Sequence, residues 1–365
     1  MRILHVSDTF LPVLGGIEVL VDDLSRHQRQ AGHEVHVLTA AKGPAEPGLT
    51  RLPGRFAPVE PVLDAVAPEV VHCHSSLVSP LAWRAARAAA ERGIPALLTM
   101  HSLVTPTSLT AAPLALAGRV VPRTVPWTAV SSVAARALEP VVEAPVSVLP
   151  NGFDVDGTRT AHPGTAEQPT IVSVMRLARR KRPLALISML AGVRDLLGDL
   201  PWRAVIVGDG PQAAAVRAAV VTAGLQDRVR LTGRLDRDEV LHLLAGADLY
   251  LAPARLESFG LAALEARCSG LPVVAMRSGG VGEFVRDGVD GWLVDDDSAM
   301  TLKTAQLLAT RGLLAQAGQA CRSELPDLDW PATVARSLDA YEFAALSRHL
   351  TSTVQVSGAR VIDQT

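Results

Sequence analysis

The sequence is poor in cysteine and has no long apolar run, and these two absences exclude two classes of protein. Three cysteines stand far apart among 365 residues, with no CxxC pair, which argues against a disulfide framework. No apolar stretch reaches the roughly 18–20 residues that a membrane-spanning helix requires. The opening MRILHVSDTF fits a strand and lacks the basic and apolar regions of a signal peptide. We therefore expect a cytoplasmic protein, with peripheral membrane contact unsupported but left open.

The sequence also has no excess of basic over acidic residues. The 35 lysines and arginines are balanced by 37 aspartates and glutamates, so the formal net charge is −2. Without a global positive field, nucleic-acid binding is not expected. Only three of the basic residues are lysines, namely Lys42, Lys181 and Lys303. Because lysine is so rare, a lysine at a candidate site is less readily explained by chance than an arginine.

What the chain does contain is a repeated alternation of strand and helix patterns. Its length suits two domains, and 48% hydrophobic with 20% charged residues is typical of globular proteins. After the first strand, apolar residues recur at helical spacing: Ile17, Leu20, Val21 and Leu24. Strands are expected at 3–6, 35–38, 70–75, 95–102, 128–132 and 146–152, and again at 170–177, 203–210, 229–233, 249–253, 271–276 and 291–295. The alternation predicts an α/β fold with two doubly wound parallel sheets.

The polar stretch 154–169 contains proline and glycine, has little pattern and is the best linker candidate. The domains expected on this basis are an N-terminal domain at 1–155, a C-terminal domain at 156–328, a helix at 329–347 that packs back on the N-terminal domain, and a tail at 348–365 without a core pattern. In such folds, ligands bind beyond the carboxyl ends of the strands.

Glu257 and Glu265 lie eight residues apart, with SFGLAAL between them. If a helix begins between Ser258 and Leu261, Glu257 lies on the preceding loop and Glu265 about one turn inside the helix. Free backbone N–H groups at a helix N-terminus bind anions and suit a diphosphate. A carboxylate can accept hydrogen bonds from sugar hydroxyls. Taken alone, the two glutamates could equally be a solvated loop residue and a helix-face residue, so the surrounding sequence has to decide.

Arg176 and Lys181, in SVMRLARRKRP, follow the end of a predicted strand. Negative charge grows on a diphosphate leaving group as its glycosidic bond breaks. Fixed cations therefore stabilise the transition state more than the ground state. The alternative is a solvated basic loop, since three further arginines surround Lys181.

The segment PARLESFGLAALEARCSGLPVVAMRSGGVGEFVRDGVDGWLVDDD (253–297) resembles the donor-binding segment of the retaining glycosyltransferase family 4. That family has the GT-B fold, two Rossmann-like domains that face each other across a cleft. The resemblance covers most of the chain and is densest in its C-terminal half. It also extends to the Arg176–Lys181 loop, although Met175 and Arg182 stand where the family commonly has glycine. These departures leave the cations in place, and the exact path of the loop is left open.

The resemblance implies a role for each matching residue. Glu257 would position the donor sugar, Glu265 would bind the ribose hydroxyls, and His101 would lie beside the donor sugar. The catalytic residues implied are Glu257, His101, Arg176 and Lys181. The donor-binding residues implied are Gly15, Gly16, Arg176, Lys181, Gly208, Asp209, Arg234, Leu235, Glu257, Ser258, Phe259, Gly260, Leu261 and Glu265.

No metal site is expected. His72 and His74 alternate on one strand and share a face, but no third ligand is near them in the sequence, so we interpret them as structural or acceptor-side residues. The acidic triplets at 236–238 and 295–297 fit solvated loops. Enzymes of the resembling family need no metal or other cofactor, since cations and helix N-termini offset the diphosphate charge.

The sequence therefore predicts a metal-independent, retaining transferase that moves a hexose-type sugar from a UDP- or GDP-sugar to a hydroxyl acceptor. The acceptor is left open between a small molecule or natural product and a glycolipid or polysaccharide. The segments 42–61 and 103–126 show no regular element and are expected to shape its site. Two alternatives share the fold: a sugar-nucleotide epimerase and a non-catalytic nucleotide-sugar-binding partner. Monomer and homodimer are both compatible with the sequence.

Overall fold

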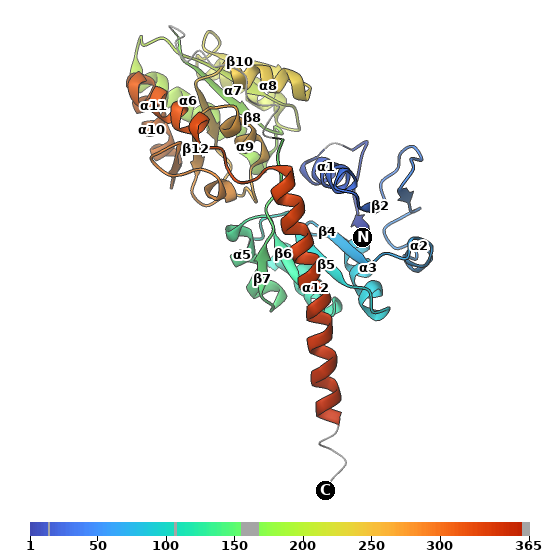
Figure 1. Cartoon of the computed structure of the whole chain (residues 1–365). Helices are drawn as coiled ribbons and strands as arrows, with labels where there is room; N and C mark the ends of the chain where they lie inside the picture. Colours follow the sequence, from blue (N-terminus) through green and yellow to red (C-terminus); the bar gives the residue numbers. More distant parts are fainter. Residues whose placement is uncertain (14, 106–107, 155–167, 360–365) are drawn as a thin grey trace. The chain divides into compact units, whose positions relative to one another are not determined.

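The computed structural model describes residues 1–13, 15–105, 108–154 and 168–359. The chain forms two compact units. The first contains Met1–Gly152 together with Leu328–Thr365, and the second contains Phe153–Asp327. The C-terminal helix therefore belongs to the same unit as the N-terminal strands (Figure 1).

The first unit is built on a seven-stranded sheet in which every neighbouring pair is parallel, in the order β3-β2-β1-β4-β5-β6-β7. Its strands are β1 (Arg2–Ser7), β2 (Glu34–Thr39), β3 (Leu49–Arg51), β4 (Val70–Ser75), β5 (Ala96–Met100), β6 (Trp127–Ala129) and β7 (Val146–Val148). Its helices are α1 (Gly16–Gln30), α2 (Glu60–Val66), α3 (Pro80–Glu91), α4 (Ser108–Val120), α5 (Ser132–Val142) and α12 (Trp330–Ala359).

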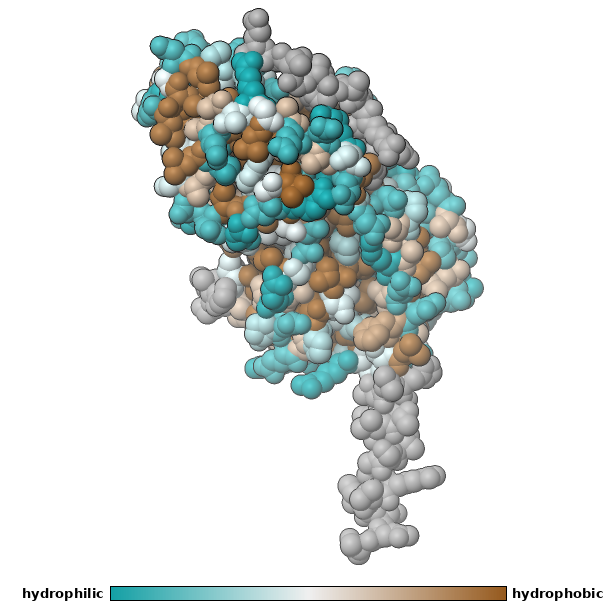
Figure 2. All heavy atoms as spheres, turned by 60° about the vertical axis from the view of Figure 1, so that its left-hand side comes forward, coloured by the Kyte–Doolittle hydropathy of each residue, from teal (hydrophilic) through white to brown (hydrophobic). Residues whose placement is uncertain are grey.

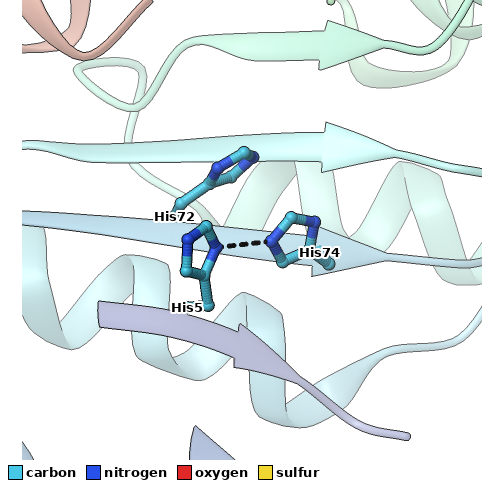
Figure 3. Close-up of side chains that lie close together, drawn as sticks. All are labelled: His5, His72 and His74. Carbon is cyan, nitrogen blue, oxygen red and sulfur yellow. Dashed lines mark hydrogen bonds between the residues drawn. The ribbon is translucent and has the colours of Figure 1, made fainter. Parts of the chain in front are cut away.

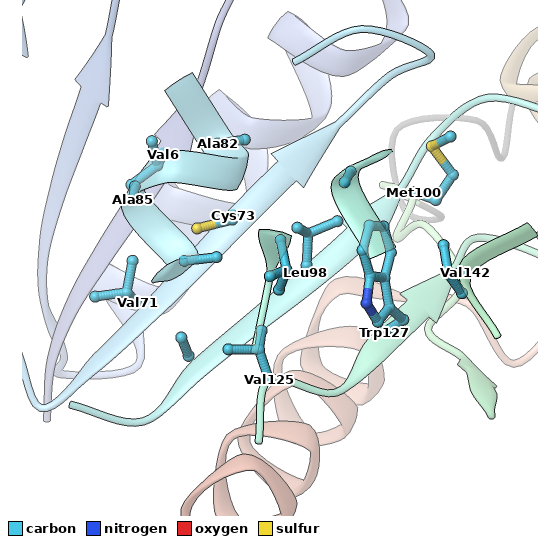
Figure 4. Close-up of a cluster of buried hydrophobic side chains, with 14 of the residues drawn as sticks. Val6, Val71, Cys73, Ala82, Ala85, Leu98, Met100, Val125, Trp127 and Val142 are labelled. Atoms are coloured by element: carbon cyan, nitrogen blue, oxygen red, sulfur yellow. The ribbon is translucent and has the colours of Figure 1, made fainter. Parts of the chain in front are cut away.

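Alternate residues of these strands face two different helix layers, as the two-residue period of a strand requires. On one face, Val6 and Cys73 pack with buried residues of α2, α3, α4 and α5 (Figure 4). On the other face, Ile3 packs against Tyr341 of α12. Helices α1 and α12 share a small apolar cluster on that second side.

The second unit is built on a six-stranded, all-parallel sheet in the order β10-β9-β8-β11-β12-β13. Its strands are β8 (Thr170–Val174), β9 (Arg203–Val207), β10 (Val229–Gly233), β11 (Leu249–Ala252), β12 (Val273–Met276) and β13 (Gly291–Val294). Its helices are α6 (Pro183–Leu197), α7 (Ala213–Thr222), α8 (Arg237–Ala245), α9 (Leu261–Cys268), α10 (Asp297–Ala309) and α11 (Arg311–Ser323), with single turns η2 (Arg179–Lys181) and η3 (Gly280–Glu283). The expected pair of parallel sheets is confirmed.

For 42–61 the expectation of irregular structure fails only at a short strand and at the start of a helix, whereas for 103–126 it is wrong. The first segment contains β3, a three-residue edge strand too short to show a pattern, and the start of α2. The second contains α4, within which the only proline is Pro113. The other prolines of that segment lie outside the helix, so counting prolines overestimated the breaks.

The expectation that regular structure ends near residue 347 is also wrong, because α12 continues to Ala359. Between Ser347 and Val356 the sequence has no proline or glycine, so nothing there ends the helix. Of the predicted linker 154–169, residues 155–167 lie outside the described ranges. Among the described helices, none is long and apolar enough to cross a membrane.

Candidate functional site

The predicted donor-binding residues of the second unit all follow the carboxyl ends of its strands. Arg176 follows β8, Gly208 follows β9, Arg234 follows β10, and Glu257 follows β11. Because the sheet is entirely parallel, these ends meet at one edge of it. Ligands of open α/β sheets bind at this edge.

The loop that carries Glu257 leads directly into α9. Gly260 is the N-cap and has a φ of +98°, a backbone conformation that favours glycine. A Cβ at this position would also meet Val281 at 2.9 Å. Glu257 is on the loop, and the half-buried Glu265 is in the second turn of α9, so the two glutamates flank the helix N-terminus as the spacing predicts.

The start of α9 presents free hydrogen-bond donors. The backbone N–H groups of residues 259–262 have no hydrogen-bond acceptor within the described part of the chain, whereas those of Ala263 and Leu264 donate to the Gly260 carbonyl. The first N–H groups of a helix have no partner inside the helix, and together with the helix dipole they attract an anion. This N-terminus can therefore hold a phosphate group.

Lys181 and Glu257 form an ion pair at the same place. Lys181 Nζ donates to Glu257 Oε2, and the two side chains are 35% and 18% exposed. Arg180 Nε donates to the carbonyl oxygen of Leu256 at 3.1 Å, and the N–H of Gly280 donates to the Glu257 carbonyl at 2.8 Å. The loop after β8 and the loop before α9 are thus joined by side-chain and backbone bonds.

Arg182, which stands where the resembling family commonly has glycine, adopts the left-handed backbone conformation of a glycine. Its φ is +59° and its ψ +44°. Its guanidinium donates to both carboxylate oxygens of Asp297, at 2.9 and 2.6 Å, and to the carbonyl oxygen of Pro253 at 3.0 Å. These bonds offset the backbone strain of a left-handed conformation at a residue other than glycine. They also hold the pKa of the Asp297 carboxyl below its usual range.

The turn after β9 fixes the position of the Arg176 loop. A Cβ on Gly208 would overlap the carbonyl oxygen of Met175, and one on Gly210 would lie 2.6 Å from the carbonyl oxygen of Leu177. Both glycines have positive φ. The Arg176 side chain is exposed, and no described residue forms a hydrogen bond or ion pair with it. A cation therefore stands free beside the turn.

Two further observations concern the two glutamates and the loop that follows β10. Burial raises the pKa of Tyr250, and the charges of Glu265 and Glu257 raise it further, so both carboxylates act on one phenol of β11. Arg234 is exposed and Leu235 half-buried, directly after Gly233, whose carbonyl accepts from the N–H of Gly208 at 2.8 Å.

The acidic triplets are not simply solvated loops, contrary to the sequence-based expectation. Asp236 accepts from the N–H of Glu239 and forms a capping box at α8, while Asp296 caps α10. Asp295 lies 3.2 Å from Arg277, and Asp297 is bonded to Arg182. Helix capping and ion pairing therefore account for Asp236, Asp295, Asp296 and Asp297.

In the first unit, Gly15 is the N-cap of α1, and the helix begins at Gly16. A Cβ on Gly15 would overlap the carboxylate of Glu18. The start of α1 is thus already faced by a negative charge, which disfavours a phosphate there and suits a hydroxyl. His101 follows the carboxyl end of β5 and is half-buried.

A third histidine lies beside His72 and His74, contrary to the sequence-based expectation that no third ligand is near. It is His5 of β1, and ring nitrogens of the three residues lie within 4.8 Å of one another (Figure 3). His5 Nδ1 is hydrogen-bonded to His74 Nε2 at 2.9 Å, and His72 is bonded to Tyr341 and Thr99. A metal ion would have to displace these bonds.

Gln28 of α1 and His5 are the polar residues that sequence reasoning missed. Both are fully buried and hydrogen-bonded to each other at 2.7 Å. One signal pointed to His5 alone: a histidine inside the otherwise apolar strand RILHVS must have a partner, because a buried polar group without one is costly.

The first unit also has a surface groove of about 420 Å³ between α4, α5 and α12, lined in part by Arg119, Arg123 and Phe343. None of the predicted site residues lines it. The groove is therefore separate from the candidate site.

On the face of the molecule shown in Figure 2, hydrophobic and hydrophilic residues are interspersed.

Two Rossmann-like domains of parallel sheet define the GT-B class, and solved structures of that class share the fold. An Anabaena protein, HepE, in complex with UDP and glucose, superposes with a TM-score of 0.76 at 20% identity, over 94% of this chain and 99% of that chain. WaaG, a glycosyltransferase involved in lipopolysaccharide biosynthesis, gives 0.73 at 16% identity, over 93% and 99%.

The sequence models of two families match successive parts of the chain. Glycosyltransferase Family 4 matches residues 14–156, and Glycosyl transferases group 1 matches residues 157–323. The chain belongs to the family 4, group 1 glycosyltransferases, as its motifs predict.

Curated relatives have named activities on inositol compounds. The D-inositol 3-phosphate glycosyltransferase of Xylanimonas cellulosilytica is 28% identical over 92% of this chain and 93% of its own length. A GDP-mannose-dependent alpha-(1-6)-phosphatidylinositol monomannoside mannosyltransferase of Mycobacterium tuberculosis is 32% identical, over 49% of this chain and 51% of its own length.

Proposed function

We propose that this glycosyltransferase moves a hexose-type sugar from a UDP- or GDP-sugar to a hydroxyl of an inositol-type polyol, with retention of anomeric configuration and without a metal ion. The free N–H groups at the start of α9, beside the Lys181–Glu257 ion pair, carry the proposal. They combine an anion site with a carboxylate at the edge of a parallel sheet where ligands bind.

The diphosphate of the donor lies at the N-terminus of α9, against the N–H groups of residues 259–262. Arg176, which is free, and Lys181, released from Glu257, neutralise the charge that grows on the leaving group. These groups offset the negative charge of the diphosphate, as a metal ion does in other transferases. Arg234, Leu235 and Asp209 border the nucleoside from the neighbouring strand ends.

The two glutamates bind the sugars of the donor. When Lys181 pairs with the diphosphate instead of Glu257, the Glu257 carboxylate becomes free to accept hydrogen bonds from the transferred sugar. Glu265, one helix turn further on, accepts from the ribose hydroxyls.

We assign the acceptor to the first unit, where Gly15 and Gly16 admit a hydroxyl close to the backbone and His101 contacts a hydroxyl of a bound substrate. The activities of the two relatives favour an inositol ring, free or lipid-linked, over other natural products and polysaccharides. The protein would work in the cytoplasm as a monomer or homodimer.

The reaction exchanges one glycosidic bond for another. The bond from the anomeric carbon to the diphosphate oxygen breaks, and a bond to the acceptor oxygen forms on the same face of the sugar. The acceptor proton passes to the departing diphosphate, so the products are a nucleoside diphosphate and the glycoside. No side chain then has to act as the base.

The deciding experiment incubates the protein with UDP- and GDP-sugars, each with and without inositol and inositol phosphate, in the presence of a chelator. Proton NMR of the product gives its anomeric configuration. We expect a glycoside with the donor's configuration, lost in Glu257→Gln. An epimer formed without acceptor would favour the epimerase, and binding without turnover would favour a non-catalytic partner.

A further inference from the structure

A chain of buried hydrogen bonds in the first unit starts at α12, passes through α1 and ends at His101. Its members are Ser337, Gln28, His5, His74 and His101. The first four are at most 2% exposed. Every step is a side-chain bond between different elements of the fold, so the chain exists only when the unit is fully assembled.

The first bonds determine how the Gln28 amide is oriented. The hydroxyl of Ser337 donates to the carbonyl oxygen of Val334 at 2.7 Å, so its oxygen can only accept from Gln28. Gln28 Nε2 therefore faces Ser337, at 3.1 Å, and Tyr341, at 2.9 Å, and donates one hydrogen to each. Gln28 Oε1 is left to accept.

The orientation of Gln28 fixes the proton on each histidine in turn. His5 Nε2 donates to Gln28 Oε1 at 2.7 Å, so His5 Nδ1 of the neutral ring is an acceptor. That nitrogen accepts from His74 Nε2 at 2.9 Å (Figure 3). His74 Nδ1 in turn accepts from His101 Nε2 at 3.0 Å.

Each ring in this chain is neutral, which the ordering requires. Burial lowers the pKa of His5 and of His101 to about 4, and holds that of His74 well below its usual range. With one proton per ring, every buried nitrogen paired, and Gln28 Nε2 donating to Ser337 and Tyr341, a single arrangement satisfies all the bonds. His101 then carries its proton on Nε2.

We propose that Gln28, His5 and His74 are positioning residues that hold His101 in its Nε2–H tautomer, so that its Nδ1 accepts a hydrogen bond from a substrate hydroxyl. Nδ1 of His101 has no hydrogen-bond partner among the residues that the structure describes. The ring lies at the carboxyl edge of the sheet, so a sugar or polyol hydroxyl is the chemical class that fits it. This inference rests on the proposed function only for the identity of the substrate.

The same amide also orders a second branch. Tyr341 accepts from Gln28 and donates to His72 Nδ1 at 2.9 Å. His72 Nε2 donates to Thr99 Oγ1 at 2.7 Å, and Thr99 is bonded to Thr128 at 2.7 Å. The bonds of this second branch are compatible with the same orientation of Gln28.

Long-range proton–nitrogen correlation NMR of the whole protein reads the tautomer directly, with the His101 signals assigned from their loss in His101→Gln. We expect Nε2–H in the wild-type protein. Nδ1–H would overturn the proposal without any activity measurement, so this result is independent of whether the proposed transfer reaction is found.

The variant Gln28→Leu removes the group that orders the chain, and Gln28→Met, which also lacks the amide, serves if the leucine variant does not fold. In Gln28→Leu we expect a mixture of tautomers at His101 and a fall in kcat/KM of about tenfold, the effect of one hydrogen bond. Gln28→Met should have the same effect on both readouts. The matched control Gln30→Leu, at an exposed glutamine of the same helix, should change neither readout.

Two results would contradict the proposal through these variants: a single Nε2–H tautomer in a folded Gln28→Leu protein, or loss of that tautomer with unchanged kcat/KM. Absence of glycosyl transfer with every donor and acceptor would instead count against the proposed function, while the tautomer of His101 would still decide whether Gln28, His5 and His74 order the ring.

Discussion

Lys181 and Glu257, which are 76 positions apart in the sequence, form a direct ion pair at the start of α9. In this arrangement the lysine is neutralised before any donor binds. Under the proposed function, binding of a diphosphate would exchange one anionic partner of Lys181 for another and free the carboxylate, so that a single side chain would couple these two events.

Replacing Lys181 with alanine should weaken the binding of nucleoside diphosphate about 10- to 100-fold, because a charge-assisted hydrogen bond of roughly 1.5–3 kcal/mol is lost. The affinity for UDP and GDP, measured by calorimetry, checks this. Lys303→Ala is the matched control, since Lys303 is in α10 of the same unit and bonded to Gln306. Equal effects of the two substitutions would contradict the assigned role of Lys181.

Arg182 allows a test of backbone strain. Both Arg182→Gly and Arg182→Ala lose the bonds to Asp297, but only glycine adopts a φ of +59° without strain. We expect the glycine variant to be about 1 kcal/mol more stable than the alanine variant in urea unfolding. An alanine variant as stable as the glycine variant would show that the left-handed conformation is not imposed by the fold.

Gly208→Ala should lower the free energy of unfolding by about 3 kcal/mol, because the new Cβ overlaps the backbone of Met175. Gly312 of α11 is the matched control: its φ is not positive and nothing lies within 4 Å of an added Cβ. Gly312→Ala should raise the stability by about 0.5–1 kcal/mol, as usual inside a helix. Thermal unfolding of both variants checks the opposite signs.

The buried histidines should make stability depend on pH. The folded pKa of His5 is about 4, below the unfolded value near 6.5, so the unfolded chain binds the proton first as the pH falls. Neutral His5 therefore contributes on the order of 3 kcal/mol to the free energy of unfolding above pH 6.5, and this contribution is lost as the pH falls towards 4. Asp8, whose pKa burial raises, acts in the opposite direction.

The measurement is the slope of unfolding free energy between about pH 6.5 and 5, where unfolded carboxylates are still ionised. His5→Gln should flatten that slope relative to the wild-type protein, even if it lowers the overall stability. His242→Gln, at an exposed histidine of α8, should leave it unchanged. An unaltered slope in His5→Gln would mean that His5 does not titrate differently in the two states.

Tyr341→Phe should destabilise the first unit by about 2 kcal/mol, because Gln28 and His72 each lose a buried hydrogen-bond partner. Phe343→Ala, two residues along the same helix, removes a side chain that is 55% exposed and should change stability by less than about 0.5 kcal/mol. Urea unfolding of the two variants makes the comparison. A neutral Tyr341→Phe would show that the hydroxyl contributes nothing to the docking of α12.

Local pattern was enough to predict the two parallel sheets and the place of Glu257 and Glu265 around a helix start, because strand period, turn glycines and helix caps act over a few residues. It also placed Lys181 on the correct loop. It could not show that Lys181 contacts Glu257, which depends on the pairing of β8 with β11. The assigned roles of these residues stay predictions until variants are measured.

The histidine chain was beyond local reasoning for a related cause. His5, His74 and His101 come from separate stretches of sequence, and Gln28 looks like any polar helix residue until α12 covers it. Arg182 shows that a local rule can also be overridden. A position that favours glycine in the resembling family can hold an arginine when distant partners offset the strain. Both cases depend on tertiary contacts that no window of sequence contains.

The hydrogen bond from Gln28 to Tyr341 joins residues 313 positions apart. A ribosome making this protein will have synthesised the whole second unit before the residue that completes the interior of the first emerges. Gln28 of the N-terminal unit therefore lacks this hydrogen-bond partner until Tyr341 of α12 has been synthesised. A fragment ending at residue 152 would lack that partner, so attempts to express the first unit alone should include α12 joined by a linker.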